Sequence, residues 1–228
     1  MTFGEGFVRL RFVTGIVALV SGGLDSLVLI RTLQQRRAAV HPVYVRCGLW
    51  WESVELWWLR RWLAAVASPR IGSLTILDIP MRTFYGSHWS VSGRRVPSRT
   101  TPDAAVYLPG RNVMLLGAAG LYAAQHRCST LTLGTLSGNP FADAAPRFFS
   151  TFAASLSDAL SHPLAIEAPL RRFTKAQVIA ADPEAPSHLT FSCLRPEGKY
   201  HCGRCNKCAE RRRAFRQARV PDPTTYAH

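Results

Sequence analysis

Six consecutive residues near the N-terminus have the types and spacing needed to bind an anion: Ser21-Gly22-Gly23-Leu24-Asp25-Ser26. They stand between an apolar run, Ile16 to Val20, and a segment of helical period, Asp25 to Gln35. Two glycines let a backbone turn tightly and direct successive N–H groups into one concavity, and a following helix adds its positive N-terminal dipole. We therefore predict a phosphate-binding loop in which Asp25 holds Mg²⁺. The simpler alternative is a turn in which Asp25 or Ser26 only caps the helix.

Four of the six cysteines are gathered near the C-terminus, with the spacing Cys193-x8-Cys202-x2-Cys205-x2-Cys208. Four thiolates are the usual ligand set of a closed, tetrahedral Zn²⁺ site, and such a site has no open position for catalysis. We predict a structural zinc site. Free or disulfide-linked cysteines are the alternative, and His201 is interpreted as a neighbour rather than a ligand.

The chain of 228 residues is strongly basic, with 28 Lys and Arg against 14 Asp and Glu. Half of this excess lies in residues 195–219, which hold nine Lys or Arg and two Glu. The charge therefore belongs largely to the cysteine tail, and it neither requires nor excludes a nucleic-acid partner. The most apolar N-terminal stretch, Val13 to Ile30, is interrupted by the Ser/Gly loop, which excludes a membrane span. We expect a cytoplasmic protein, whose thiols stay reduced.

Short apolar runs alternate with segments of helical period, a pattern typical of a doubly wound, Rossmann-like parallel sheet. We predict an α/β domain over residues 1–189, a lid or substrate loop over 80–108, and a zinc-binding tail over 190–228. After a turn at His41-Pro42, strands are expected at Val43–Arg46, Leu74–Ile79, Leu131–Gly134 and near Ala165. Helices are expected at 52–66, Asn112–Gln125, Phe148–Leu160 and from Thr174.

Further motifs follow the Ser/Gly loop in order: Leu108-Pro109-Gly110-Arg111-Asn112, Pro169-Leu170, Lys175, and the cysteines ending in Cys208-Ala209-Glu210-Arg211. Together they resemble the QueC (ExsB) family, the 7-cyano-7-deazaguanine synthases of the PP-loop ATP pyrophosphatase superfamily. The resemblance implies ATP, Mg²⁺ and Zn²⁺ as cofactors, and an adenylated 7-carboxy-7-deazaguanine that reacts with ammonia to give the nitrile. It also implies that the β- and γ-phosphates bind Ser21, Gly22, Gly23, Leu24, Asp25 and Ser26.

Three residues are candidates for catalysis: Asp25, Arg111 and Lys175. The planar guanidinium of Arg111 suits a phosphate or a carboxylate, although a structural salt bridge is an alternative. Lys175 follows Thr174, a good N-cap, and either reaches the phosphates or is a solvated surface lysine. Because a cation at a helix N-terminus opposes the dipole, another group should hold Lys175 there. Asn112 is interpreted as a helix cap.

Two loops depart from the family pattern, Val45 to Glu52 and Gly134 to Asp143. Both should lie at the carboxyl ends of strands, so the departures concern substrate recognition more than ATP binding. Two alternatives therefore stay open: a QueC-like enzyme that attaches a deazapurine acid to a protein amine, and a tRNA-binding or tRNA-thiolating PP-loop protein. Asn139 and Asp143 could orient Mg²⁺ or a purine, or Asn139 could simply form a turn.

Five of the six tryptophans occupy residues 50–62 and lie on more than one helical face. Trp58 and Trp62 are expected in the core, and the others indicate a homodimer partner or a stacked base. Cys47, at the end of a predicted strand, is either a nucleophile or a buried, inert thiol.

Overall fold

The computed structural model describes residues 15–228, so the first fourteen residues of the predicted domain lie outside it. Five strands form one parallel sheet in the order β3-β2-β1-β4-β5. Their bounds are β1 Ile16–Leu19, β2 Val40–Arg46, β3 Thr75–Asp78, β4 Thr130–Leu133 and β5 Ala165–Glu167. The chain winds outward from β1 in both directions, and the predicted doubly wound α/β sheet is confirmed.

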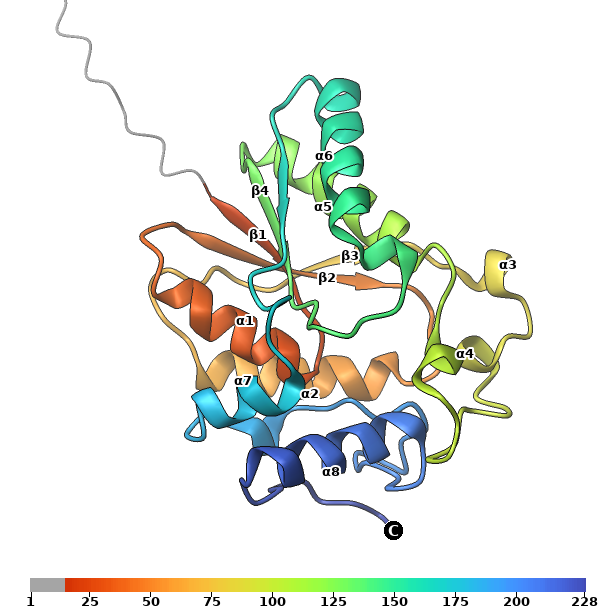
Figure 1. The fold of residues 1–228 in the computed structure, drawn as a ribbon. Coiled ribbons are helices and arrows are strands. Elements are labelled where there is room, and N and C mark those ends of the chain that lie inside the picture. Colours follow the sequence, from red (N-terminus) through yellow and green to blue (C-terminus); the bar gives the residue numbers. More distant parts are fainter. Residues whose placement is uncertain (1–14) are drawn as a thin grey trace, which may run out of the picture.

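Helices cover both faces of the sheet (Figure 1). On one face lie α5 and α6, and on the other lie α1 and α2, with α7 and α8 beyond them (Figure 1). The helix bounds are α1 Leu24–Gln34, α2 Glu52–Ala65, α5 Arg111–Gln125, α6 Pro146–Leu160, α7 Lys175–Ala181 and α8 Asn206–Ala218. Shorter pieces are α3 Arg82–Tyr85, α4 Trp89–Ser92, and the 3₁₀ turns η1 Asp103–Val106, η2 Ala142–Ala144 and η3 Ser187–Leu189.

Strands β1 and β2 divide their side chains between two hydrophobic cores. Val17 and Leu19 of β1 pack with Leu116 of α5, whereas Ile16 and Ala18 pack on the opposite face with helix α1. Burial on both faces explains why the predicted strands are continuous apolar runs rather than alternating ones.

The predicted turn at His41-Pro42 is wrong, because both residues lie inside β2. Pro42 is paired with Ala18 of β1. Val40 donates its amide to Arg70 on the β3 side, and alternate residues of a parallel strand face the same neighbour. The amide that Pro42 lacks would face that side too, where the β3 ladder begins only at Val43. A proline therefore fits this strand at no cost in ladder hydrogen bonds.

Residues 80–108, expected as a lid or substrate loop, are packed against the rest of the protein. Val91 and Val106 are buried, and the Trp89 ring stacks on Trp51 with centroids 5.7 Å apart. The amide of Arg99 donates to the Arg204 carbonyl at 2.9 Å, so this segment also joins the cysteine tail.

The sequence predicted no helix in the cysteine tail, yet α8 spans thirteen residues there, beginning before the last cysteine. It is rich in arginine, and its buried side includes only a few apolar side chains, Ala214 and Phe215 among them. Those two pack into the core that α1 and α2 share. Such a narrow apolar stripe gives little helical periodicity to detect. Nowhere in residues 15–228 is there a helix with the length and apolarity that crossing a membrane demands.

Candidate active site and metal centre

The Ser/Gly loop leaves the carboxyl end of β1 and enters α1 directly. Within it the Ser26 hydroxyl accepts the Ser21 amide at 2.9 Å, and the Ser21 hydroxyl accepts the Gly23 amide at 3.2 Å. From outside, the Phe191 amide donates to the Gly22 carbonyl at 2.7 Å. These bonds fix the loop against the first turn of α1, where the helix dipole favours an anion.

Gly22 is required by a close approach and not by an unusual backbone angle. A Cβ on Gly22 would lie 2.8 Å from the Glu55 carbonyl oxygen of α2. Gly23 has φ of −76°, which any residue adopts, and a Cβ there would meet nothing nearer than 3.3 Å. The sequence suggested that Gly22 is needed for a tight turn. The structure shows instead that a side chain at this position would collide with α2.

Two adjoining clefts open at this edge of the sheet, of about 240 and 230 Å³. Asp25, Gly134, Thr135 and Asn139 line both of them. The first cleft is also lined by Ser21, Ser26, Tyr44 and Arg111, and the second by Lys175, Lys207 and Glu210. The structure therefore brings all three candidate catalytic residues close to the Ser/Gly loop, although Arg111 and Lys175 line different clefts.

Asp25 has one carboxylate oxygen engaged and one unengaged. Its Oδ2 lies 3.3 Å from the Lys175 ammonium. Its Oδ1 is buried and accepts no hydrogen bond from any residue in 15–228. Burial raises the pKa of Asp25 from its ordinary value, and Glu210 raises it too, while Lys175 lowers it. An unpartnered carboxylate oxygen beside a cleft fits a ligand of Mg²⁺.

Lys175 is held at the start of α7 as the dipole argument required. Thr174 is the N-cap, in a capping box with Gln177. The ammonium lies 2.5 Å from the Glu210 carboxylate as well as near Asp25. Burial tends to lower the pKa of Lys175, but these two carboxylates raise it above its ordinary value, so the side chain is a half-buried cation.

Arg111 begins α5, and Glu55, Cys47 and Tyr44 raise its pKa against the opposing effect of burial. Its Nε is buried with no hydrogen-bond acceptor within the described residues. The Tyr44 hydroxyl donates to the Glu55 carboxylate at 2.8 Å, so these two groups satisfy each other. The guanidinium therefore lies near the Glu55 carboxylate yet retains a free N–H.

The capping role expected of Asn112 belongs to Asp143 instead. The Asp143 carboxylate accepts the Asn112 amide at 3.1 Å, and the Asn112 side chain donates to the Asp143 carbonyl at 3.0 Å. Asn139 accepts the Phe141 amide at 3.0 Å, which is the turn-forming role. This pair of contacts fixes the β4–α6 connection beside the clefts.

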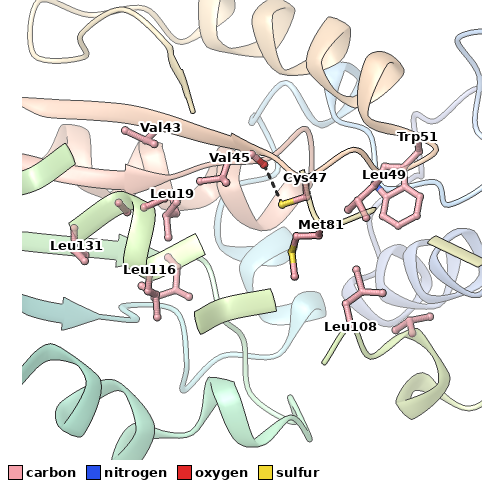
Figure 2. Packing of buried hydrophobic residues seen from close by; sticks show 14 of the residues in the cluster. Leu19, Val43, Val45, Cys47, Leu49, Trp51, Met81, Leu108, Leu116 and Leu131 are labelled. Atoms are coloured by element: carbon pink, nitrogen blue, oxygen red, sulfur yellow. Dashed lines mark hydrogen bonds between the residues drawn. The ribbon is translucent and has the colours of Figure 1, made fainter. Parts of the chain in front are cut away.

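Cys47 has the features of an inert thiol. It is fully buried between Val45 and Met81, and its Sγ–H points to the Val45 carbonyl (Figure 2). Burial raises the pKa of the thiol to about 11. A protonated, inaccessible sulfur is a poor nucleophile, so the structure favours the packing interpretation.

The four C-terminal cysteines converge in one buried cluster. Their sulfurs lie within 4.8 Å of one another, with pairs at 3.5, 3.9 and 4.0 Å. A tetrahedral site with Zn–S bonds of about 2.3 Å requires sulfurs about 3.8 Å apart, so the set fits. Backbone amides of Leu194, Arg195, Cys202 and Arg204 donate to these sulfurs at 3.3–3.5 Å. His201 turns away and accepts the Ser192 amide, consistent with a neighbour.

Sequence reasoning assigned no role to three glutamates near the clefts, although Glu210 stands in the motif that follows the cysteines. Glu52 accepts three amides of the β2–α2 turn, at 2.6, 2.6 and 2.9 Å. Glu55 pairs with Tyr44, and Glu210 pairs with Lys175. For Glu210 the sequence did contain a signal, because it is one of only two acidic residues in the basic stretch 195–219.

A doubly wound parallel sheet with an anion-binding loop after its first strand, and charged clefts at that edge, defines a nucleotide-binding type of α/β protein. A comparison with family models matches residues 15–219 to "Queuosine biosynthesis protein QueC". The chain belongs to the QueC family, as its motifs predicted.

Relatives cover nearly the whole chain. The 7-cyano-7-deazaguanine synthase of Methanothrix thermoacetophila is 32% identical over 93% of this chain and 98% of its own. That of Anaeromyxobacter dehalogenans is 31% identical over 92% and 95%. Among solved structures, a 4-thiouridine synthetase–RNA complex with bound ATP aligns with 90% of this chain and 50% of its own, at 15% identity and a TM-score of 0.48. That likeness is too weak to carry an argument.

Proposed function

We propose that this protein is a 7-cyano-7-deazaguanine synthase. The observation that carries the proposal is the meeting of the Ser/Gly loop, Asp25, Arg111 and Lys175 around two adjoining clefts. Relatives of about 30% identity that carry this name align with 92–93% of the chain.

In the proposed reaction, the carboxylate of 7-carboxy-7-deazaguanine attacks the α-phosphate of ATP and pyrophosphate leaves. Ammonia then displaces AMP to give the amide. The amide oxygen attacks the α-phosphate of a second ATP and pyrophosphate leaves. This oxygen then departs as part of AMP while the nitrogen loses two protons, which gives the nitrile. The amides of the loop and the N-terminus of α1 would bind the departing pyrophosphate. Lys175 would supply a positive charge there, and Arg111 would orient a carboxylate or the α-phosphate.

Two metal ions complete the proposal. Asp25 would hold Mg²⁺ through its unpartnered oxygen, and the ion would neutralise charge on the phosphates. Cys193, Cys202, Cys205 and Cys208 would hold Zn²⁺ as a structural ion.

The test uses the purified full chain with ATP, Mg²⁺, ammonia and 7-carboxy-7-deazaguanine. We expect AMP and the nitrile, detected by mass, each dependent on the deazapurine acid. AMP no higher than in the absence of the acid would overturn the proposal. Acid-dependent AMP without nitrile would instead favour a protein amine as acceptor.

The homodimer inferred from the tryptophans stays a proposal with narrower support. Trp51 and Trp62 are buried, and Trp57 and Trp58 contact Lys199 of the tail. Of this group Trp50 is 54% exposed. Analytical ultracentrifugation of the wild type and Trp50→Ser would test it, since a dimer through this residue should dissociate in the variant.

A further inference from the structure

Glu210 belongs to α8, the helix that begins after Cys205 and contains Cys208, yet its side chain lines the cleft beside the Ser/Gly loop. Its Oε1 lies 2.5 Å from the Lys175 ammonium and its Oε2 lies 2.5 Å from the Lys207 ammonium. The side chain is 19% exposed. Two short, charge-assisted hydrogen bonds hold both of its oxygens in place.

Four side chains of alternating charge therefore run from the loop to the tail: Asp25, Lys175, Glu210 and Lys207. Lys175 is shared between two carboxylates, at 2.5 Å from Glu210 and 3.3 Å from Asp25. Without Glu210 the ammonium would have Asp25 as its nearest anion. It would then move onto Asp25 and compete there with a magnesium ion.

The other acid on this cleft wall does not substitute for Glu210. Asp103 accepts the Asn206 side chain at 3.0 Å, and Arg213 lies 3.4 Å from its other oxygen. Both Asp103 oxygens are thus engaged by other partners, whereas Glu210 contacts Lys175.

We propose that Glu210 is a positioning residue of the ATP site. It holds the Lys175 ammonium away from Asp25, which leaves one Asp25 oxygen for Mg²⁺ and the ammonium beside the phosphates. This inference rests on the proposed function for its ligand, ATP. It also gives the cysteine cluster a role, because α8 starts directly after Cys205 and carries Glu210 to the cleft.

Glu210→Gln tests the proposal, since it removes the charge and keeps the shape. Binding of Mg–ATP to the zinc-loaded full chain is measured by calorimetry, without any deazapurine acid. We expect the Kd for Mg–ATP to rise about tenfold, because the variant loses the charge-assisted contact between residue 210 and Lys175. A carboxylate that merely added negative charge near the phosphates would do the opposite, because its removal would tighten binding. Unchanged or tighter binding overturns the proposal.

The matched control is Glu197→Gln, which removes the same charge from the same tail. Glu197 pairs with His228 at the surface and is 44% exposed. We expect its Kd for Mg–ATP to stay within twofold of the wild type. Zinc content and melting temperature are measured for both variants, so that a damaged tail is recognised.

A double variant separates positioning from general damage. If Glu210 acts through Lys175, Glu210→Gln should add nothing in a Lys175→Met background. Effects that multiply in the double variant overturn the proposal. Should Glu210→Gln lose zinc, Glu210→Asp replaces it, with a smaller rise in Kd that again vanishes in the Lys175→Met background. Calorimetry needs no turnover, so a wild type that binds ATP but forms no AMP would overturn the proposed function alone.

Discussion

The cleft edge and the cysteine cluster differ in how far the chain satisfies the groups that would bind a ligand, although Asn206 Oδ1, beside the cluster, also lacks a partner within residues 15–228. At the clefts, within residues 15–228, Asp25 Oδ1 and Arg111 Nε are buried without hydrogen-bond partners. At the cluster, four sulfurs face one another and receive four backbone amides. An unsatisfied buried group costs stability unless a ligand uses it. We infer that the first region suits a ligand that comes and goes, whereas the second would hold the proposed zinc ion permanently.

Asp25→Asn should give the largest effect, because it removes a charge from the region that exchanges ligands. We expect AMP formation to fall by at least about a thousandfold, equivalent to roughly 4 kcal/mol of transition-state stabilisation. The melting temperature should change little, since one Asp25 oxygen is already unpaired and Lys175 keeps Glu210 as its partner. Asp78→Asn, on the exposed edge strand, is the control and should keep full activity. Unaltered AMP formation in Asp25→Asn would remove Asp25 from the mechanism.

Cys205→Ser should have the opposite effect to Asp25→Asn, because its main loss should be in stability rather than in AMP formation. We expect zinc to fall below one equivalent and the free energy of unfolding to drop by more than about 3 kcal/mol, because metal binding is coupled to folding. Elemental analysis and denaturant titration measure the two quantities. Cys128→Ser, a buried cysteine outside the cluster, should keep its zinc. A Cys205→Ser protein as stable as the wild type without metal would refute a structural zinc site.

Gly22→Ala tests whether the loop is constrained by α2, as the 2.8 Å approach to the Glu55 carbonyl indicates. Overpacking of this kind costs about 1–3 kcal/mol, and the loop should lose ATP affinity as it shifts. Gly23→Ala is the matched control: its φ is ordinary, and its Cβ would meet nothing nearer than the Ser21 hydroxyl at 3.3 Å, the end of a side chain that can shift, so the free protein should stay within about 0.5 kcal/mol. Equal destabilisation of the two variants would argue against the contact with α2.

The parts of the two sites that could be predicted from sequence are those whose chemistry is local. Ser21 to Ser26 stand together in six residues, and the four cysteines in sixteen. Their spacing alone restricts what they can bind. The parallel sheet followed equally from short apolar runs, because burial on both faces leaves no polar alternation.

The interactions that were missed join residues far apart in the chain. Lys175 meets Asp25 from 150 positions away and Glu210 from 35. No periodic pattern in the sequence indicates contacts between residues so far apart. The sequence therefore fits a surface position of Lys175 equally well. Asn112 was misassigned for the same reason, since the carboxylate that caps its helix comes from Asp143. Helix α8 was missed because few of its side chains are apolar.

The smallest expected effect is at Trp58, where the two regions are joined. Trp58 lies on α2, whose Glu55 touches the Ser/Gly loop, and its Nε1 donates to the Lys199 carbonyl of the cysteine tail at 2.8 Å. Trp58→Phe keeps a ring in place and removes this hydrogen bond, at a cost of about 1 kcal/mol. The melting temperature should fall by about 2–4 °C.

Trp50→Phe is the control for this change, because its ring is more than half exposed. If the hydrogen bond mainly anchors the tail, Trp58→Phe should release zinc to a chelator faster than Trp50→Phe, with ATP affinity unchanged. A loss of ATP affinity without faster zinc release would mean that Trp58 acts on the loop through α2. The cleft and the cysteine cluster would then share α2 as a support, rather than being connected through α8 alone.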